Sequence, residues 1–282
     1  MKKAVIFYFS GTGNTWYVSA ELAGYLGQGG IKTGIYSIET VTPEQAAALV
    51  SESDLIGFGY PVHGSDLPRP MVRFIESLPS SDGKQAFVFC TQWLWSGDGA
   101  AIGASFLRKK GFKVQWGEHF LMPNNVTVSV IRLPYTNNKD RLKKVRDRAS
   151  RKIKHFSGKL IEGKPFRHGF NPVAYLLGSI QRVPYRRVFD KLQNDIAVDE
   201  ETCIDCGDCV DLCPTGNLYY ADTKINVKGC CILCLRCYNF CPAAAITYMG
   251  RPHLKQRGEP YRGPVENFDP FIMVRANNSG TE

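Results

Sequence analysis

The chain of 282 residues is long enough for two modest domains or one large domain, each with its own hydrophobic core. Hydrophobic residues make up 44% and charged residues 22% of the chain, as is usual for a globular protein, and the formal net charge is +9. No stretch approaches the roughly 18 consecutive apolar residues of a membrane-spanning helix. The short apolar run near the N-terminus lacks a cleavage site, so we expect a cytoplasmic protein without a membrane span.

Strand and helix patterns alternate over residues 1–160, which predicts an α/β domain with a parallel sheet covered by helices on both faces. The predicted strands are 3–9, 31–38, 54–60, 85–91 and 112–121. The predicted helices are 14–27, 43–52, 69–77, 98–110 and 137–160. The expected fold is therefore a doubly wound, five-stranded parallel sheet.

The segment after the first predicted strand has a composition suited to binding a phosphate. It reads Ser10-Gly11-Thr12-Gly13-Asn14-Thr15 and runs into the first predicted helix. Glycines allow a tight turn that exposes N–H groups, hydroxyls add donors, and the helix N-terminus supplies positive potential. No Gly-Lys-Ser/Thr or GxGxxG pattern follows, so neither a P-loop nor a dinucleotide site is indicated. Donors without a Lys favour a terminal phosphomonoester such as that of FMN.

Two further loops follow predicted strands, where ligands of such sheets bind. They are Tyr60-Pro61-Val62-His63-Gly64 and Thr91-Gln92-Trp93-Leu94-Trp95-Ser96-Gly97. Tyr60, Trp93 and Trp95 are candidates to contact a flavin ring, and ordinary packing is the alternative for each. His63 is either a hydrogen-bonding partner of the flavin or a surface-loop residue without a catalytic role. The glycines at 97, 99 and 103 lie in the second loop and the following helix, and we do not interpret them as a nucleotide fingerprint.

The rest of the chain divides into three predicted segments. Gly and Pro interrupt residues 161–195, which predicts a linker with one short helix. A cysteine-rich module follows at 196–250. Residues 251–282 are expected to form an irregular tail packed onto the two domains.

Nine of the ten cysteines lie between Cys203 and Cys241, which indicates metal binding and not a disulfide framework. The spacing C-x2-C-x2-C-x3-C-P occurs twice, at Cys203, Cys206, Cys209 and Cys213 and again at Cys231, Cys234, Cys237 and Cys241. In this pattern three thiolates bind one [4Fe–4S] cluster and the fourth binds the other cluster. We therefore assign Cys203, Cys206, Cys209 and Cys241 to one cluster, and Cys231, Cys234, Cys237 and Cys213 to the other. Structural zinc, the alternative, typically takes two separated pairs of ligands.

Two cysteines remain outside this assignment. Cys230 is either a spare free thiol or a ligand in place of Cys231, although only Cys231 keeps the spacing. Cys90 ends a predicted buried strand and is interpreted as a small core residue.

The loop FSGTGNT resembles the flavodoxin phosphate loop, and the cysteine repeats resemble those of two-[4Fe–4S] bacterial ferredoxins. The order of the two modules resembles the flavodoxin–ferredoxin fusion proteins of anaerobic bacteria and archaea, over residues 1–160 and 196–250. This resemblance implies a flavodoxin-like FMN domain followed by a small α+β ferredoxin-like domain. It also implies that the segment Met122-Pro123-Asn124-Asn125 approaches the flavin edge. The loop at 91–97 departs from the glycine-rich flavodoxin pattern.

Two functions fit this combination of modules. One is an electron carrier that transfers electrons between two [4Fe–4S] clusters and FMN and on to a redox partner. The other is a ferredoxin-fed FMN reductase acting on a small acceptor, although no acid–base constellation points to it. Nine Lys or Arg between 139 and 154 form either a solvated helix face or a docking surface for an acidic ferredoxin, flavodoxin or downstream reductase. No nucleic-acid-binding motif accompanies the basic charge.

Overall fold

Six parallel strands form the central sheet of the computed structural model, which describes residues 1–130 and 138–275. The strands are β1 (Lys2–Tyr8), β2 (Ile31–Ser37), β3 (Leu55–Pro61), β4 (Gln85–Gln92), β5 (Lys113–Leu121) and β6 (Phe166–Arg167). Their order in the sheet is β2-β1-β3-β4-β5-β6, and the first five follow the flavodoxin-like order 2-1-3-4-5. The predicted α/β fold is confirmed, but the prediction of five strands is wrong. The sixth has only two residues, too few to show a strand pattern, and pairs with Trp116 and Gly117 of β5.

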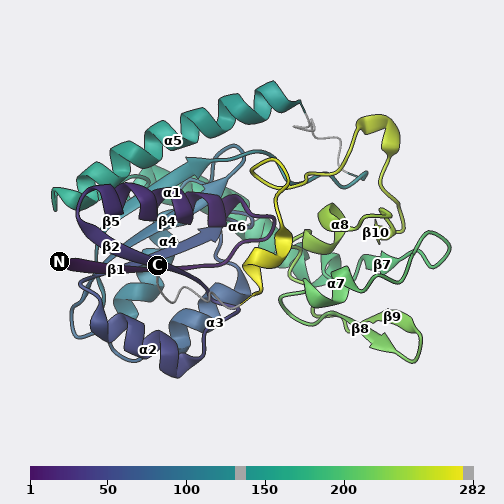
Figure 1. The fold of residues 1–282 in the computed structure, drawn as a ribbon, viewed down its shortest axis with the longest axis horizontal. Helices are drawn as coiled ribbons and strands as arrows, with labels where there is room; N and C mark the ends of the chain where they lie inside the picture. Colours follow the sequence, from purple (N-terminus) through teal and green to yellow (C-terminus); the bar gives the residue numbers. More distant parts are fainter. Residues whose placement is uncertain (131–137, 276–282) are drawn as a thin grey trace.

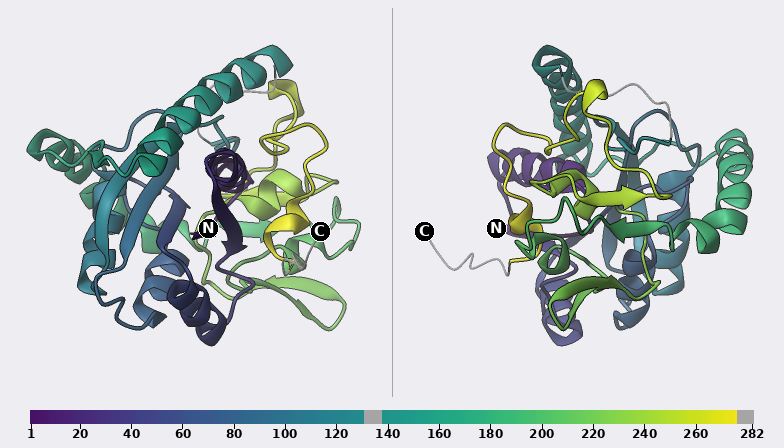
Figure 2. Two further views of the ribbon diagram at one scale, coloured as in Figure 1. Left: turned by 60° about the vertical axis from the view of Figure 1, so that its left-hand side comes forward. Right: turned by 90° about the vertical axis from the view of Figure 1, so that its right-hand side faces the viewer.

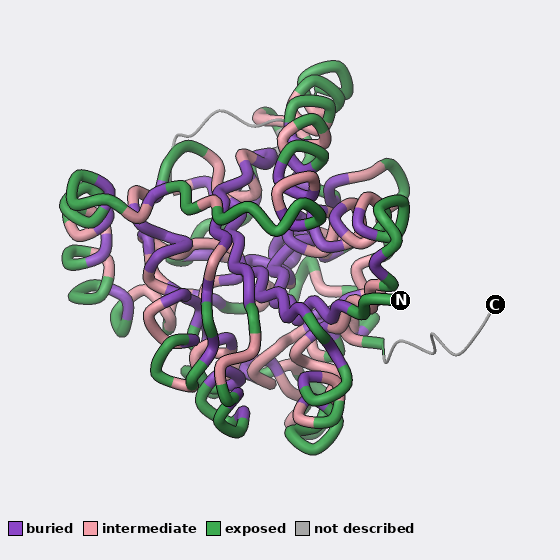
Figure 3. The backbone as a smooth tube through the Cα atoms, turned by 90° about the vertical axis from the view of Figure 1, so that its left-hand side faces the viewer, coloured by how far each residue is buried: buried purple, intermediate pink, exposed green. Residues whose placement is uncertain are grey.

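Helices cover both faces of this sheet (Figure 1). They are α1 (Asn14–Gln28), α2 (Pro43–Glu52), α3 (Arg69–Ser77), α4 (Gly99–Lys109) and α5 (Lys139–Ile161). The apolar residues of α1 and α5 share one core with one face of the strands, and those of α2, α3 and α4 share a second core with the opposite face. Because both faces are covered, β1, β3 and β4 are almost continuously apolar and buried (Figure 3). These helices lie where the sequence predicts them, and residue 137 of the last predicted helix lies outside the described residues.

Residues 161–195 differ from the prediction of a linker with one short helix. Helix α6 (Pro172–Leu192) has 21 residues and includes both Gly178 and Pro184. Gly178 packs against Asp98 so closely that a Cβ atom there would overlap its carboxylate. The glycine that suggests a loop in the sequence is thus required for close packing of a long helix. Pro184 is tolerated in the exposed outer part of the helix.

The outward surface of α6 is unusually apolar for a solvent-exposed helix. Val173, Leu176 and Ile180 are all more than half exposed. The opposite face of the helix holds the buried residues Ala174, Gly178, Arg182 and Phe189. No helix within residues 1–130 and 138–275 is long and apolar enough to cross a membrane.

The cysteine-rich module is small and contains short strands and helices (Figure 1). Its elements are β7 (Ile196–Val198), α7 (Asp208–Asp211), β8 (Leu218–Ala221), β9 (Lys224–Val227), α8 (Arg236–Phe240) and β10 (Ile246–Tyr248). The strands form two antiparallel pairs, β7 with β10 and β8 with β9. Ile196, Leu218 and Tyr238 pack in its core together with Val128, which follows β5 in the chain. The module therefore shares its core with the first domain.

The C-terminal segment packs against both domains (Figure 2). It is irregular apart from two short 3-10 turns, η1 (Lys255–Arg257) and η2 (Pro270–Met273), and residues 276–282 of the predicted tail lie outside the described residues. The Tyr261 hydroxyl donates to Asn14 Oδ1 of α1 at 2.6 Å, and the Tyr261 N–H donates to Asn239 Oδ1 of α8 at 3.1 Å. The ring of Phe268 contacts Trp16 of α1.

Candidate functional site

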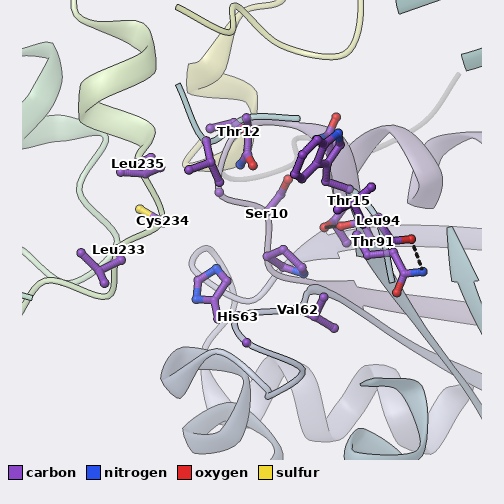
Figure 4. A pocket seen from close by; sticks show the side chains of 18 of the residues that line it. Ser10, Thr12, Thr15, Val62, His63, Thr91, Leu94, Leu233, Cys234 and Leu235 are labelled. Carbon is purple, nitrogen blue, oxygen red and sulfur yellow. Dashed lines mark hydrogen bonds between the residues drawn. The ribbon is translucent and has the colours of Figure 1, made fainter. Parts of the chain in front are cut away.

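A cavity of about 290 Å³ lies at the carboxyl ends of β1, β3 and β4, where the cysteine-rich module meets the sheet (Figure 4). This volume is close to the lower limit of roughly 300 Å³ for small-molecule sites. The predicted residues that line it are Ser10, Gly11, Thr12, Asn14, Thr15, Pro61, Val62, His63, Gly64, Thr91, Gln92, Trp93, Leu94 and Trp95. Three separate predicted loops therefore meet at one pocket.

Hydroxyl groups shape the loop between β1 and α1. Ser10 Oγ accepts hydrogen bonds from the N–H of Gly13 at 3.1 Å and of Trp16 at 3.4 Å. The Thr15 and Thr91 hydroxyls lie 2.8 Å apart and join this loop to the end of β4. The sequence suggests the Ser10 and Thr15 hydroxyls as donors to a phosphate, whereas in the structure they form hydrogen bonds within the protein.

The backbone N–H groups of this loop remain available for a ligand. Within residues 1–130 and 138–275, those of Gly11, Thr12, Asn14 and Thr15 donate to no protein acceptor. They surround the start of α1, whose first turn holds no acidic residue. Unpaired donors at a helix N-terminus are the arrangement that binds a phosphate group. The donor set therefore fits the phosphomonoester of FMN.

Gly13 and Asn14 hold the loop against other parts of the chain. Gly13 has φ of 94°, and a Cβ atom there would lie 2.6 Å from Phe268 and Pro264 of the tail. Gly13 is not among the residues that line the pocket. The Asn14 side chain donates to the carbonyl oxygen of Pro123 at 3.0 Å, which brings the predicted segment 122–125 to the pocket.

The loop after β3 presents His63 to the cavity (Figure 4). His63 and Asp66 exchange two backbone hydrogen bonds, and Gly64 and Ser65 take left-handed conformations between them. Burial lowers the pKa of His63 to about 4, although Asp66 opposes the shift. The imidazole is therefore neutral near pH 7, with one donor and one acceptor nitrogen.

Tyr60, the first residue of this predicted loop, lies elsewhere. Its ring is fully buried in the core, and its hydroxyl donates to the carbonyl oxygen of Gly99 at 2.7 Å. Tyr60 is absent from the pocket lining, so its selection as a contact of a flavin ring is wrong. The alternative of ordinary packing is correct for this residue. Because Tyr60 is the last but one residue of a central strand, helix α4 covers it.

The loop after β4 forms the opposite wall. Leu94 and Trp95 are 58% and 46% exposed, so the wall continues to the protein surface. Gly97 is not at the pocket, because it packs against α6, where a Cβ atom would overlap the backbone of Gly178. Gly103 likewise packs against Tyr60. The glycines of this segment serve helix packing.

Several lining residues come from elements that the sequence does not connect with the pocket. They are Ser65, Val126, Gln181, Leu233, Cys234 and Leu235, whereas Pro123 and Asn125 come from the segment 122–125 that the resemblance already places at the flavin edge. Gln181 belongs to α6, and its Nε2 donates to the carbonyl oxygen of Trp95 at 3.3 Å. The three residues 233–235 belong to the second cysteine repeat. No local signal in the sequence reveals a contact across more than 200 residues.

The eight repeat cysteines gather in two groups. The first thiol group consists of Cys203, Cys206, Cys209 and Cys241, and the second thiol group consists of Cys213, Cys231, Cys234 and Cys237. Burial raises the pKa of Cys209, and the nearby Cys241, Cys203 and Cys206 raise it further. Burial also raises the pKa of Cys237, with added contributions from Cys234, Cys231 and Cys213 and a smaller one from Cys209 of the first thiol group. Each group thus joins three cysteines of one repeat with the fourth of the other.

The backbone of the two repeats turns in the same way. Asp205 and Gly207 have φ of 53° and 80°, and Leu233 and Leu235, 28 residues later, have φ of 54° and 57°. Left-handed residues on either side of the central cysteine bend each loop tightly. Backbone N–H groups also point at the sulfurs, since Leu233 donates to Cys231 Sγ at 3.3 Å. Such hydrogen bonds influence the reduction potential of a cluster.

The eight cysteines supply thiolates, which are the usual ligands of [4Fe–4S] clusters. In the described part of the chain, no three His, Cys, Asp or Glu side chains lie close enough to bind one metal ion. A [4Fe–4S] cluster binds each of its thiolates to a different iron atom, so its ligands are more widely spaced.

The two remaining cysteines differ in exposure. Cys230 is exposed, and its Sγ donates to the carbonyl oxygen of Thr215 at 3.6 Å. Cys90 is fully buried among apolar residues of the sheet, as expected for a core residue.

Comparisons with known proteins find similarities in two parts of the chain. A family model of the 4Fe-4S binding domain matches residues 196–219, which includes the first cysteine repeat. Flavodoxin 2 from Bacillus cereus is 18% identical over 57% of this chain and 99% of its own, with a TM-score of 0.41. A flavodoxin from the domain Archaea is 19% identical over 55% of this chain and 99% of its own, with a TM-score of 0.37. No curated protein matches the chain. The fold assignment rests on the strand order and not on these two similarities.

Proposed function

We propose that this chain is an iron–sulfur flavoprotein that transfers electrons between two [4Fe–4S] clusters and FMN, and on to a redox partner. One observation carries the proposal. A single pocket is lined both by the loop of residues 10–15 after β1, called the phosphate-type loop below, and by Cys234 of the second cysteine repeat. The match to the 4Fe-4S binding domain supports cluster binding at residues 196–219. The architecture is consistent with a flavodoxin–ferredoxin fusion protein.

The residues for FMN divide into two sets. The free N–H groups of Gly11, Thr12, Asn14 and Thr15 would hold the phosphate. The loops 61–65 and 91–95 would enclose the isoalloxazine ring, and neutral His63 supplies a hydrogen-bonding group at its edge. When bound, FMN would supply a centre that accepts one or two electrons.

The two thiol groups would each hold one cluster. Each cubane would be tied to both repeats, because its fourth ligand comes from the other repeat. Placing the clusters and FMN in one chain gives a high effective concentration for electron transfer without a diffusional encounter.

The charge distribution indicates where an acidic partner would dock. Residues 196–222 contain seven Asp or Glu and no Lys or Arg, although the whole chain has a net charge of +9. An acidic ferredoxin or flavodoxin would be repelled by that segment. The basic surface of α5, with nine Lys or Arg between 139 and 154, is the better docking site for it.

A second candidate function is a ferredoxin-fed FMN reductase that acts on a small acceptor. It is favoured by Gln181, which extends from α6 over the pocket and hydrogen-bonds the Trp95 loop. This wall would enclose a small molecule beside the ring, whereas a pure carrier needs an exposed flavin edge.

Anaerobic reconstitution with iron, sulfide and FMN tests the main proposal. We expect about eight iron atoms and one FMN per chain, with flavin fluorescence quenched on binding. Zinc bound in place of iron, or a chain that binds no flavin, would contradict it.

A further inference from the structure

The second cysteine repeat lies directly against the phosphate-type loop. Figure 4 shows Leu233, Cys234 and Leu235 on the side of the pocket that faces Ser10 and Thr12. A Cβ atom on Gly11 would lie only 2.9 Å from the carbonyl oxygen of Cys234. The missing side chain at Gly11 therefore allows the backbone of the second repeat to touch the loop.

The side chain of Arg236 stabilises this contact through hydrogen bonds. Its side chain is fully buried, and it donates to the carbonyl oxygen of Ser10 at 2.6 Å and to that of Gly11 at 3.1 Å. Both carbonyl groups belong to the loop that would hold the phosphate. Arginine is suited to this position because its planar guanidinium carries five donors in fixed directions.

The same guanidinium reaches two further segments. It donates to both carboxylate oxygens of Glu39, which follows β2, at 2.9 Å and 2.7 Å. It also donates to the carbonyl oxygen of Leu212, the residue before Cys213, at 2.8 Å. One buried side chain thus links the phosphate-type loop and the end of β2 with the two cysteine repeats, both of which contribute to the second thiol group.

The first thiol group lies away from the pocket. None of its four cysteines is among the described residues that line the cavity. Cys206 is exposed, and so are its neighbours Ile204 and Asp205. A cluster held there would face solvent and partner proteins.

We propose that a cluster held by the second thiol group would be the inner station, the group that exchanges electrons directly with the flavin. We also propose that Arg236 is the positioning residue that holds the second thiol group against the phosphate-type loop. This inference rests on the proposed function and adds an order to it. The first thiol group would hold the outer station, which would exchange electrons with a partner whose docking face is basic, because residues 196–222 around it carry seven Asp or Glu and no Lys or Arg. With both groups bound, the transfer would remove one electron from the cluster of the second thiol group and add one electron to the ring, and no bond would form or break.

The positioning role is tested by Arg236→Lys with Arg262→Lys as its matched control. Arg262 also donates to module carbonyl groups, those of Asn239 and Cys241, but not to the phosphate-type loop. We expect Arg236→Lys to raise the Kd of FMN about tenfold with unchanged iron content, and Arg262→Lys to leave the Kd within about twofold. Equal effects of the two substitutions would overturn the positioning role.

A second variant guards against loss of folding in Arg236→Lys. Glu39→Gln keeps an acceptor beside Arg236 and leaves the cysteine module unchanged. We expect it to raise the Kd of FMN about threefold to tenfold in a protein with wild-type iron content. An unchanged Kd in Glu39→Gln would overturn the positioning role, whether or not Arg236→Lys folds.

The order of the stations is tested by Cys237→Ser and Cys206→Ser. Both remove one cysteine that does not line the pocket, the former from the second thiol group and the latter from the first. In partly reduced protein, a nearby reduced cluster accelerates relaxation of the flavin radical in EPR power saturation. We expect Cys237→Ser to abolish this enhancement and Cys206→Ser to retain it. The reverse pattern would overturn the order.

The wild-type protein separates this inference from the proposed function. If it binds no FMN or no iron, the proposed function itself fails. If it binds both and the variants show the reverse pattern, only the order of the stations fails.

Discussion

Arg182 of α6 and Asp98 before α4 form a buried, bidentate ion pair, with N–O distances of 2.9 Å and 3.0 Å. The Arg182 side chain is 9% exposed and that of Asp98 is fully buried. Arg182 also donates to the carbonyl oxygen of Ser65 in the loop after β3. The helix is thereby attached to two of the loops that form the pocket. It is a structural part of the first domain and not a free linker.

This pair predicts that Arg182→Met is strongly destabilising. The substitution leaves the Asp98 carboxylate buried without its cation, and breaking such a pair costs about 3–5 kcal/mol. Urea unfolding monitored by circular dichroism measures the loss. Arg187→Met is the control, since Arg187 is exposed on the same helix and its replacement should change stability by less than about 0.5 kcal/mol. Similar stabilities of the two variants would contradict the role of the pair.

Gly13→Ala should weaken FMN binding although Gly13 does not line the pocket. An alanine there takes an unfavourable φ, and its Cβ would meet Phe268 and Pro264 at 2.6 Å. We expect the Kd of FMN, measured by flavin fluorescence, to rise at least about fivefold. Gly24→Ala in the same helix meets no atom within 4 Å and should stabilise the protein by about 0.5–1 kcal/mol without changing the Kd. An unchanged Kd in Gly13→Ala would mean that the loop does not hold the phosphate.

The buried His119 predicts a loss of stability in mild acid. Its Nε2 accepts a hydrogen bond from the N–H of Ala100 at 3.0 Å, which requires the neutral ring. Burial, and then the charge of His168, lowers the pKa of His119 to about 4 from an ordinary value of 6.5, while Glu118 opposes the shift. The unfolded chain therefore binds more protons between pH 6.5 and pH 4, so this contribution to stability is complete above pH 6.5 and is lost as the pH falls.

His119→Gln, which keeps an acceptor and does not titrate, isolates this effect. Between pH 7 and pH 5 the wild type should lose about 2 kcal/mol more unfolding free energy than the variant. Other groups, including His63, act in both proteins and cancel in the difference. Parallel pH profiles for the two proteins would contradict a buried neutral His119.

Cys230→Ser and Cys231→Ser decide which of two adjacent thiols is a ligand. Cys231 is buried and belongs to the second thiol group, whereas Cys230 is exposed. We expect Cys230→Ser to retain the full iron content and Cys231→Ser to lose about half of it. Iron analysis after anaerobic reconstitution gives the answer, and loss of iron from Cys230→Ser alone would reverse the assignment.

The sequence predicts those features that depend on local patterns. Residues that are close together in the sequence encode the five longer strands, the phosphate-type loop and the cysteine spacing. The sequence places Tyr60 and Gly97 in loops at strand ends, but in the structure α4 covers Tyr60 and α6 covers Gly97. The sequence does not predict the full length of α6, because glycine and proline usually end helices, and the packing of Gly178 against Asp98 explains the glycine.

Contacts between distant segments lie outside the reach of such patterns. Arg236 reads in the sequence as an ordinary residue between two cysteines. In the structure it is fully buried and bonded to the loop at residues 10 and 11, more than 200 residues earlier in the chain. Nothing in its neighbouring residues specifies this partner. The two domains therefore share an interface that the sequence patterns do not predict.

The most direct test of the account is an anaerobic reductive titration of the reconstituted protein, followed by visible absorption and EPR spectra. We expect the flavin and both clusters to be reduced within the same protein, with about four electrons taken up per chain, one by each cluster and two by FMN. Uptake of only about two electrons, with no EPR signal from a reduced cluster, would contradict the central claim that clusters and flavin exchange electrons in one chain.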